Sequence, residues 1–166
     1  MDFELRIIVS YAEGRVMGNK GKIPWSFEAD RKRFKDSTKG KAVIVGRRTS
    51  QLLEPLSGRE RIVLTHDITL DTNGEGVVYD FEEAVRTAKF IDPEVAYIGG
   101  GHSLYMLALA HNLTRRIEAT EIHRGYQGDT FFPELGSEWR ETNRREGSYT
   151  RKDGEVVTYS FVDYER

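Results

Sequence analysis

The chain has 166 residues, of which 38% are hydrophobic and 31% charged, so it fits one folded domain rather than a disordered protein. A net charge of -2 argues against a dedicated nucleic-acid binder, and the lack of cysteine excludes a disulfide scaffold, a thiolate metal site and a cysteine nucleophile. The first residues lack the layout of a signal peptide, and no apolar run approaches the ~20 residues that span a bilayer, so we expect a cytoplasmic protein with no membrane partner.

The first predicted elements are a strand and a helix. Residues 5–9 are an apolar run, interrupted by one arginine, that is typical of a strand. A helix is expected to begin near Phe27, because Ser26 can cap one. In that helix Phe27, Asp30 and Phe34 have the spacing i, i+3 and i+7, which places them on one stripe.

Asp30 has two interpretations. An ionised carboxylate among aromatic side chains is costly unless something pairs with it. On the evidence of the helix alone, Asp30 lies at the edge of the stripe, in water or bonded to Arg31 or Arg33, because such local pairing is common. The alternative is a pocket acid that holds a cationic or amidine-like group of a ligand, with its pKa tuned by desolvation.

The second predicted strand ends in a basic segment. The apolar run 42–45 leads into Gly46, Arg47, Arg48 and Thr49, and a helix is predicted through Leu52 and Leu53. A helix N-terminus favours anions, and arginines add two-pronged donors that suit phosphate. Two solvated arginines at a turn are the other interpretation. A third strand is predicted over residues 61–65.

The next helix has a recognisable start. Asp80 and Glu83 are placed for a capping box. The apolar residues that follow recur at helical spacing: Phe81, Ala84, Val85 and Ala88.

A glycine run follows the fourth predicted strand, 95–98. It comprises Gly99, Gly100 and Gly101, and a helix is expected from about Ser103 to Ala110, with Leu104, Leu107 and Ala108 facing inward. Glycines let a backbone approach a phosphate closely or simply make a tight turn. The usual dinucleotide fingerprint is absent, since Leu104 stands where a third spaced glycine belongs.

The end of the chain differs from the rest. A fifth strand is predicted over 116–123. Segments 142–150 and 155–164, each with a strand-like alternating pattern, then flank Lys152-Asp153-Gly154, which predicts an antiparallel hairpin. Apolar runs that alternate with helices predict an α/β fold with a mainly parallel sheet. Two strand ends suited to phosphate indicate a dinucleotide with an extra phosphate, hence NADP rather than NAD.

Several segments together resemble the dihydrofolate reductase family from end to end. Residues 12–18 and 21–25 look like the mobile active-site loop of the family, and 46–49 match its G-R-x-T element. Asp30, five residues after Trp25, matches the single active-site carboxylate, and Phe34 its aromatic neighbour. Further matches follow in family order: Leu56-Ser57-Gly58-Arg59 with L-P-G-R, Gly128-Asp129-Thr130-Phe131-Phe132-Pro133 with G-D-T-x-F-P, and Tyr159-Ser160-Phe161 with the last strand.

The resemblance implies a fold and an activity. The fold is a single domain over residues 1–166, with a twisted sheet of about eight strands flanked by helices and a C-terminal antiparallel hairpin. The activity is NADPH-dependent reduction of 7,8-dihydrofolate to 5,6,7,8-tetrahydrofolate by hydride transfer, which feeds one-carbon metabolism.

It also implies roles for residues. Asp30 would hydrogen-bond the pteridine with support from Thr120, and a water gated by the loop from Ile23 to Trp25 would protonate the ring. Arg59 would bind the glutamate tail. The residues expected to contact the substrate are Ile8, Val9, Asp30, Arg31, Phe34, Leu53, Arg59 and Thr120. Those expected to hold NADPH are Ser10, Val16, Gly18, Gly46, Arg47, Arg48, Thr49, Leu64, Thr65, His66, Gly99, Gly100, Gly101, His102, Ser103, Leu104 and Tyr105. Either Gly99-Gly100 or Gly100-Gly101 would be the cis-linked pair of the family.

Two other functions compete with this one. A pyrimidine reductase of riboflavin synthesis shares the fold and cofactor, but should lack the spacing of Trp25 and Asp30 and the G-D-T-x-F-P motif. A cofactor-binding module that has lost catalysis should not keep Asp30 and Arg59. We expect a monomer with no metal and no nucleic-acid partner.

Overall fold

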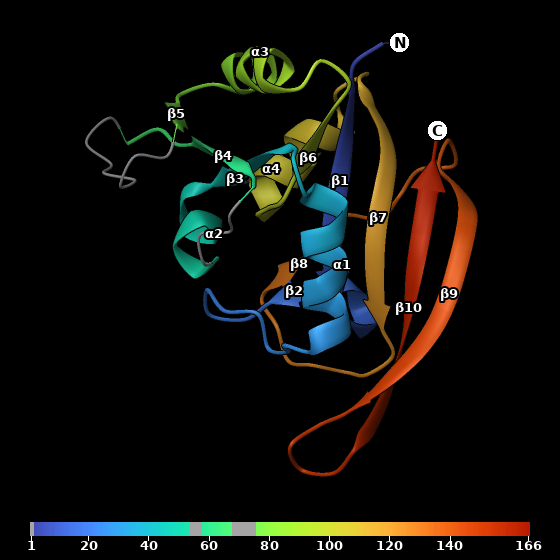
Figure 1. The fold of residues 1–166 in the computed structure, drawn as a ribbon. Coiled ribbons are helices and arrows are strands. Elements are labelled where there is room, and N and C mark those ends of the chain that lie inside the picture. Colours follow the sequence, from blue (N-terminus) through green and yellow to red (C-terminus); the bar gives the residue numbers. More distant parts are fainter. Residues whose placement is uncertain (1, 54–57, 68–75) are drawn as a thin grey trace.

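A computed structural model describes residues 2–53, 58–67 and 76–166, and these form one α/β domain around a large sheet (Figure 1). The sheet contains β1 (Glu4–Tyr11), β3 (Ala42–Gly46), β4 (Glu60–Leu64), β5 (Gly76–Val78), β6 (Val95–Ile98), β7 (Thr114–Ile122), β9 (Arg140–Thr150) and β10 (Val156–Glu165). Across the sheet the eight strands follow the order β5-β4-β3-β6-β1-β7-β10-β9.

The direction of the strands agrees with the prediction. Every pair from β5 to β7 across the sheet is parallel, whereas β10 runs antiparallel to both β7 and β9. Strands β9 and β10 form the expected hairpin. At its turn the Arg151 N–H donates to the Glu155 carbonyl and the Gly154 N–H donates to the Arg151 carbonyl, with Gly154 at a φ of 89° that favours glycine. The parallel arrangement brings the carboxyl ends of β1, β3, β4 and β6 to one edge, where ligands bind in open α/β sheets.

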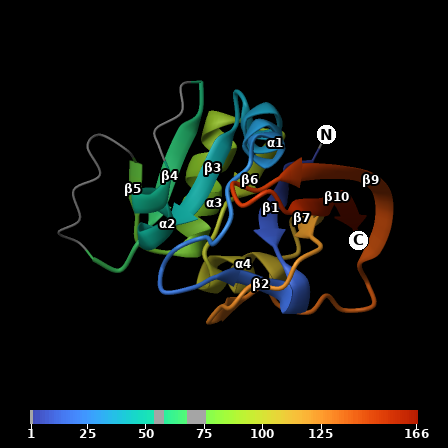
Figure 2. The ribbon, with the colours of Figure 1, turned by 90° about the horizontal axis from the view of Figure 1, so that it is seen from below.

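Helices cover both faces of the sheet. They are α1 (Glu28–Thr38), α2 (Arg47–Leu52), α3 (Phe81–Ile91) and α4 (His102–Leu109), with a short 3-10 helix at Glu13–Arg15. Figure 2, in which the sheet is seen from below, shows α1 and α4 on opposite sides of it. The alternation along β1 explains why: Leu5 and Ile7 pack in the cluster that includes α3 and α4, and Ile8 packs in the cluster that Phe34 of α1 joins.

The core lies mainly between the sheet and α3 and α4. Ile44 and Ile98 from the central strands are fully buried there, beside Ala84 and Ala88 of α3 and Leu104 of α4. Burial of one such large apolar side chain stabilises the fold by about 1.5–3 kcal/mol. Small alanines on α3 let the helix lie close to the strands.

Two local predictions were wrong. Ser26 does not cap α1: the helix begins at Glu28 after Phe27, no side-chain cap is made, and the Ser26 hydroxyl accepts a hydrogen bond from Arg31 instead. Leu107 faces outward with 46% of its surface exposed, because the inward positions of α4 are taken by Leu104, Tyr105 and Ala108.

The cap of α3 was predicted in part. The Asp80 carboxylate accepts a hydrogen bond from the Glu83 N–H at 2.8 Å, as a capping box requires. The Glu83 carboxylate, however, accepts from the N–H of Tyr79 rather than from that of Asp80. The helix therefore begins where the pattern indicates, with one of its two capping bonds displaced by a residue.

Three short strands were not predicted from the sequence. These are β5 and the two-stranded pair of β2 (Val16–Gly18) with β8 (Thr130–Phe131). Each has two or three residues, which is too short for an alternating pattern to be visible. The β2–β8 pair matters for the site, because it joins the loop after β1 to the loop after β7.

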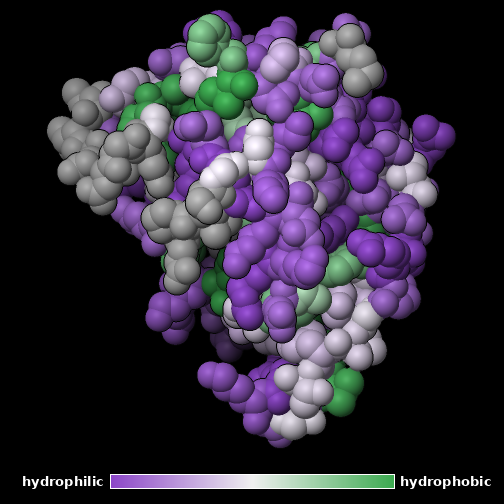
Figure 3. Space-filling model, viewed as in Figure 1, coloured by the Kyte–Doolittle hydropathy of each residue, from purple (hydrophilic) through white to green (hydrophobic). Residues whose placement is uncertain are grey.

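The surface over α1 is mainly hydrophilic, and hydrophobic side chains form separate groups on it (Figure 3). Within the described segments, no helix combines the length and the apolar character needed to cross a membrane.

Candidate active site

Asp30 lies on the first turn of α1 and points to β7. The hydroxyl of Thr120, a buried residue of β7, donates to the Asp30 Oδ1 at 2.6 Å. Burial raises the pKa of the Asp30 carboxyl above its usual value, although this hydrogen bond and the positive charges of Arg33 and Arg31 oppose the rise. The second interpretation from the sequence, a desolvated acid, is therefore closer to the structure than a solvated edge residue.

Three of the predicted substrate residues pack together on the face of the sheet that α1 covers. Ile8 of β1, Phe34 of α1 and Leu53 after α2 belong to one apolar cluster. The side chain of Val9 packs in the other cluster, on the opposite face of the sheet. An apolar wall with one carboxylate suits a flat, partly polar ring.

Tyr105 connects the glycine turn to β1. Its hydroxyl donates to the Ile8 carbonyl at 2.9 Å inside the core. Burial raises the pKa of Tyr105, and the negative charge of Asp30 adds to the effect, so the phenol remains a neutral donor. Gly100 lies against this ring: a Cβ there would lie 3.2 Å from the Tyr105 hydroxyl.

The loop between β2 and α1 is held at both ends. At its end, the indole Nε1–H of Trp25 donates to the Ser10 hydroxyl at 2.7 Å, and the ring packs on Tyr126. At its start, the Asp129 carboxylate accepts from the Lys20 N–H, and the Asp129 N–H donates to the Gly18 carbonyl. Ile23, between these contacts, is 50% exposed.

Two glycine strand ends meet at the carboxyl ends of β3 and β6. The Gly46 N–H at the end of β3 donates to the Gly100 carbonyl at 2.7 Å, and the cis peptide joins Gly100 to Gly101, the second of the two pairs that the sequence left open. A Cβ at Gly46 would lie 3.7 Å from that carbonyl oxygen, inside the space between the strand ends. Thr49 of α2 faces both Gly100 and Gly101. The glycines leave the backbone of both strand ends without side chains, which suits the close approach of a cofactor.

The predicted phosphate residues also come together. Gly46 pairs with Leu64 in the parallel register of β3 and β4, so Arg47 and Thr65 leave the sheet side by side. Arg47 and Arg48 are exposed, as His66 is, whereas Thr65 is buried. The donor set, two guanidinium groups beside a histidine, fits the extra phosphate of NADPH.

A carboxylate not found from the sequence lies among these cations. Asp67 Oδ2 is 3.4 Å from Arg47 Nη1, and the Asp67 N–H donates to the Thr65 hydroxyl. A phosphate that binds here has to compete with the Asp67 carboxylate for Arg47. No motif signals this residue, because its charged partner, Arg47, belongs to another element, α2.

Arg59 reaches back to the end of α1. Its Nε donates to the Thr38 hydroxyl at 2.8 Å, and its Nη2 donates to the Lys35 carbonyl. Leu56 and Ser57 of the tail-binding motif lie outside the described residues. The Arg59 guanidinium therefore contacts the C-terminal end of α1, about two helical turns after Asp30.

The remaining predicted residues have simpler positions. Arg31 is exposed and donates to Ser26. His102 and Ser103 are exposed at the start of α4, where His102 Nδ1 contacts the Phe131 carbonyl. Of the other predicted cofactor residues, Val16 and Leu104 are buried, and Gly18 and Gly99 are half-buried.

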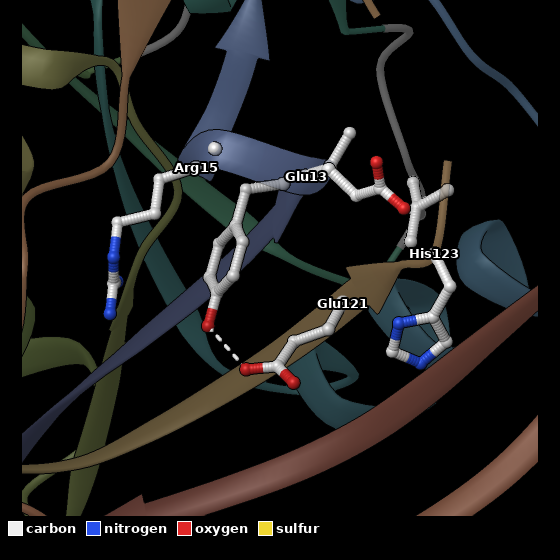
Figure 4. A pocket seen from close by; sticks show the side chains of 8 residues that line it. Glu13, Arg15, Glu121 and His123 are labelled. Atoms are coloured by element: carbon white, nitrogen blue, oxygen red, sulfur yellow. Dashed lines mark hydrogen bonds between the residues drawn. The ribbon is translucent and has the colours of Figure 1, made fainter. Parts of the chain in front are cut away.

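A separate pocket lies at the carboxyl ends of β1 and β7 (Figure 4). It has a volume of about 240 Å³ and is lined by Tyr11, Ala12, Glu13, Gly14, Arg15, Glu121, Ile122 and His123. Of these, residues 12–15 lie in the predicted active-site loop, and no individual role was predicted for any of the eight. The Tyr11 hydroxyl donates to Glu121 at 2.7 Å within the pocket. In the described part of the chain, no three His, Asp or Glu side chains gather in a way that could hold a metal.

Comparisons with known proteins give one answer. A family model described as dihydrofolate reductase matches residues 4–166. A dihydrofolate reductase of Staphylococcus haemolyticus is 30% identical over 98% of this chain and 96% of its own length. One of Neisseria gonorrhoeae is 35% identical over 97% of both chains.

A solved structure agrees with them. Dihydrofolate reductase from Enterococcus faecalis, complexed with NADP(H) and RAB-propyl, superposes with a TM-score of 0.84 at 30% identity, covering 100% of this chain and 99% of that one. These matches decide between the two reductases that the sequence left open. The chain belongs to the dihydrofolate reductase family.

Proposed function

We propose that the chain reduces 7,8-dihydrofolate to 5,6,7,8-tetrahydrofolate with NADPH, and that Asp30 is the residue that binds and orients the pteridine. The observation that carries this proposal is the Asp30 carboxylate on the first turn of α1, partly buried and held by Thr120 at 2.6 Å. A carboxylate with one oxygen fixed by a hydroxyl has its second oxygen available for the amino group and ring N–H of a pteridine.

The chain's residues have three tasks in the reaction. Asp30 fixes the ring in plane, while Ile8 and Phe34 offer it an apolar wall. When bound, NADPH supplies the hydride that the protein itself cannot provide. Because the Asp30 pKa is raised by burial, this residue is suited to influence protonation of the substrate near neutral pH.

The loop that ends at Trp25 controls access of water. Trp25 is only 7% exposed and its indole donates to Ser10 on β1, so the end of the loop is fixed to the strand that borders the proposed ring site. Ile23 stands exposed at the front of this loop. We assign to this loop the gating of the water that delivers a proton to the ring nitrogen beside the reduced carbon.

NADPH would lie along the glycine edge. Gly46, Gly100 and Gly101 offer backbone without side chains, and Arg47 and Arg48 would bind the extra phosphate. Ser10, Leu64, Thr65, His66 and Ser103 border the same edge. Arg59, at the end of α1, would bind the glutamate tail of the substrate.

The assay that tests this function follows the absorbance of NADPH with dihydrofolate as substrate. We expect rapid oxidation of NADPH that needs dihydrofolate, and slow oxidation with NADH. A diaminated pyrimidine ribosyl substrate of riboflavin synthesis should not be reduced. Turnover of that substrate but not of dihydrofolate would contradict the proposal.

We further propose that the enzyme is a cytoplasmic monomer that binds no nucleic acid. The net charge of -2 and the hydrophilic face over α1 support this. Light scattering coupled to size exclusion should give a mass near 19.1 kDa, and a mass of twice that value would contradict it.

A further inference from the structure

Arg33, one turn after Asp30 on α1, is held in a buried ion pair. Its Nη2 lies 2.8 Å from Asp163 Oδ1 on β10, and only 10% and 11% of the two side chains are exposed. Its Nη1 donates to the Ala119 carbonyl of β7, and the guanidinium lies over the Phe161 ring at 4.7 Å. The cation is therefore fixed from three sides.

The same stretch of β7 holds both Arg33 and Asp30. Ala119 binds the guanidinium through its carbonyl, and the next residue, Thr120, donates to the Asp30 carboxylate. Arg33 and Asp30 lie three residues apart on α1, so their side chains lie on neighbouring positions of one helical face. The geometry sets a fixed positive charge beside the carboxylate on a rigid frame.

A need for stability does not account for this arrangement. Burying a guanidinium and a carboxylate costs solvation that the pair only partly recovers, and apolar residues commonly do as well at such positions. Asp163 also has a second partner, Arg116, whose Nη2 lies 3.0 Å from Asp163 Oδ2. Asp163 thus does not depend on Arg33 for a counter-charge.

We propose that Arg33 is a positioning residue for the reaction: its clamped cation keeps the Asp30 carboxylate charged in the empty site and oriented against Thr120. The inference rests on the role proposed above for Asp30. It assigns to α1 a further functional residue, one turn after Asp30, that touches neither substrate nor cofactor.

Several other charged and polar groups face Asp30 and Arg33. Asp30 is faced by Arg31 and Arg33 from α1, by the Thr120 hydroxyl from β7 and by the Tyr105 phenol from α4. Arg33 is faced by Glu118 of β7, Asp163 of β10 and Arg145 of β9. Of the two arginines, Arg31 is exposed and screened by water, so Arg33 has the larger influence on the carboxylate. Burial raises the pKa of Asp30, and the Arg33 cation opposes part of that rise.

The test measures how binding of 2,4-diaminopyrimidine depends on pH. This amidine-like ring binds as a cation to an ionised carboxylate, so its affinity falls on the acid side when Asp30 takes up a proton. The acid limb of the curve therefore reports the pKa of Asp30 in the free protein, without any catalytic step. Titration calorimetry between pH 4.5 and 8 is suitable, with circular dichroism at each pH to establish that the protein is folded.

Two variants should move the acid limb in opposite directions. Arg33→Met keeps an unbranched stem but removes the cation, so the limb should move to higher pH by about 0.5 or more. Asp163→Asn removes an anion that partly neutralises Arg33, so the limb should move to lower pH. Arg33→Lys keeps a positive charge, so its acid limb should stay near that of the wild type. It is the control for any fold defect in Arg33→Met.

Lys32→Met is the matched control. It removes one positive charge from the same helix at an exposed site, where Lys32 pairs only with Asp36 among the described residues, and its acid limb should not move. An unmoved limb in Arg33→Met, or shifts of the same sign in Arg33→Met and Asp163→Asn, would overturn the inference. Asp30→Asn tests the proposed role of Asp30 separately from that of Arg33. This variant should lose the acid limb. If it retains the limb, the role proposed for Asp30 is itself wrong.

Discussion

The Asp30 carboxyl accepts a hydrogen bond from Thr120, yet its surroundings disfavour its charge and raise its pKa. A carboxyl whose pKa is higher in the folded state than in the unfolded state binds protons preferentially when folded. Its contribution to stability is therefore present at low pH and is lost as pH rises through the unfolded-state and then the folded-state pKa. Wherever the folded protein holds Asp30 ionised, its charge lowers the free energy of unfolding, which is the cost of the function proposed for it.

Asp30→Asn should separate stability from activity. The amide oxygen can still accept from Thr120, but the amide has no charge to bury, so the melting temperature at pH 7 should rise slightly above that of the wild type. Turnover of dihydrofolate should fall by at least ~10²-fold, because the amide cannot make the charge-assisted pair or aid protonation. Calorimetry and steady-state kinetics measure the two effects. Near-unchanged turnover at pH 7 would refute the assignment of Asp30.

Arg59 should act on binding rather than on turnover. Its proposed contact with the glutamate tail is far from the reacting carbon, so it stabilises ground and transition states equally. Arg59→Leu should raise KM for dihydrofolate while kcat changes much less.

A pteridine without the glutamate tail is the control for Arg59, because it has no carboxylate to lose. Arg59 also donates to Thr38 and to the Lys35 carbonyl, so it contributes to the end of α1. If Arg59→Leu weakens the tail-less pteridine as much as dihydrofolate, the role of Arg59 is structural.

At the scale of elements, the prediction from sequence follows the length of the pattern. The buried strands β3 and β6 are continuous apolar runs, and both are found where predicted. Strands β2 and β8 have too few residues to show a period, and they are fixed only by pairing across a sequence gap of more than a hundred residues. Ser26 and Leu107 were misplaced because a cap and an inward position depend on neighbours outside the helix.

The site follows the same division. Asp30, Trp25 and the two glycine ends could be proposed as site residues from the sequence, because each lies in a local motif with a mechanism. Arg33 and Asp67 were not proposed from the sequence, because each is paired with a residue on another element: Arg33 with Asp163 of β10, and Asp67 with Arg47 of α2. A lone arginine or aspartate in the sequence carries no sign of such a partner.

The loop from β2 to α1 provides a test at this scale. Trp25→Phe and Ser10→Ala each remove the hydrogen bond between the indole and the hydroxyl, and Phe preserves the packing on Tyr126. Each change should lower kcat/KM by about tenfold, equivalent to a loss of about 1–1.5 kcal/mol.

The double variant decides whether the two residues act together. Since both single changes remove one shared bond, Trp25→Phe with Ser10→Ala should be little worse than either alone. Losses that multiply in the double variant would show that the hydrogen bond does not hold the loop.

The whole molecule brings the ends of parallel strands to one edge, and the cofactor should therefore stabilise all of it. A ligand that binds only the folded state at a hundred times its Kd adds about 2.7 kcal/mol to the free energy of unfolding. For a domain of this size each kcal/mol raises the melting temperature by about 2–4 °C. Saturation with NADPH should thus raise Tm by roughly 5–10 °C.

Arg47→Met with Arg48→Met should remove most of this effect while leaving the unliganded Tm nearly unchanged, because both side chains are exposed. A charge-assisted contact is worth about 1.5–3 kcal/mol before screening, so a hundredfold weaker affinity for NADPH is expected. At the same NADPH concentration the stabilisation then falls to about 0.4 kcal/mol. NADH, which lacks the extra phosphate, should stabilise both proteins equally, and KM should rise for NADPH far more than for NADH.

Arg115→Met with Lys152→Met is the matched control. It changes the net charge equally at exposed sites away from the glycine edge, and it should keep the full increase of Tm with NADPH. Equal losses for NADPH and NADH would show that Arg47 and Arg48 do not bind the extra phosphate.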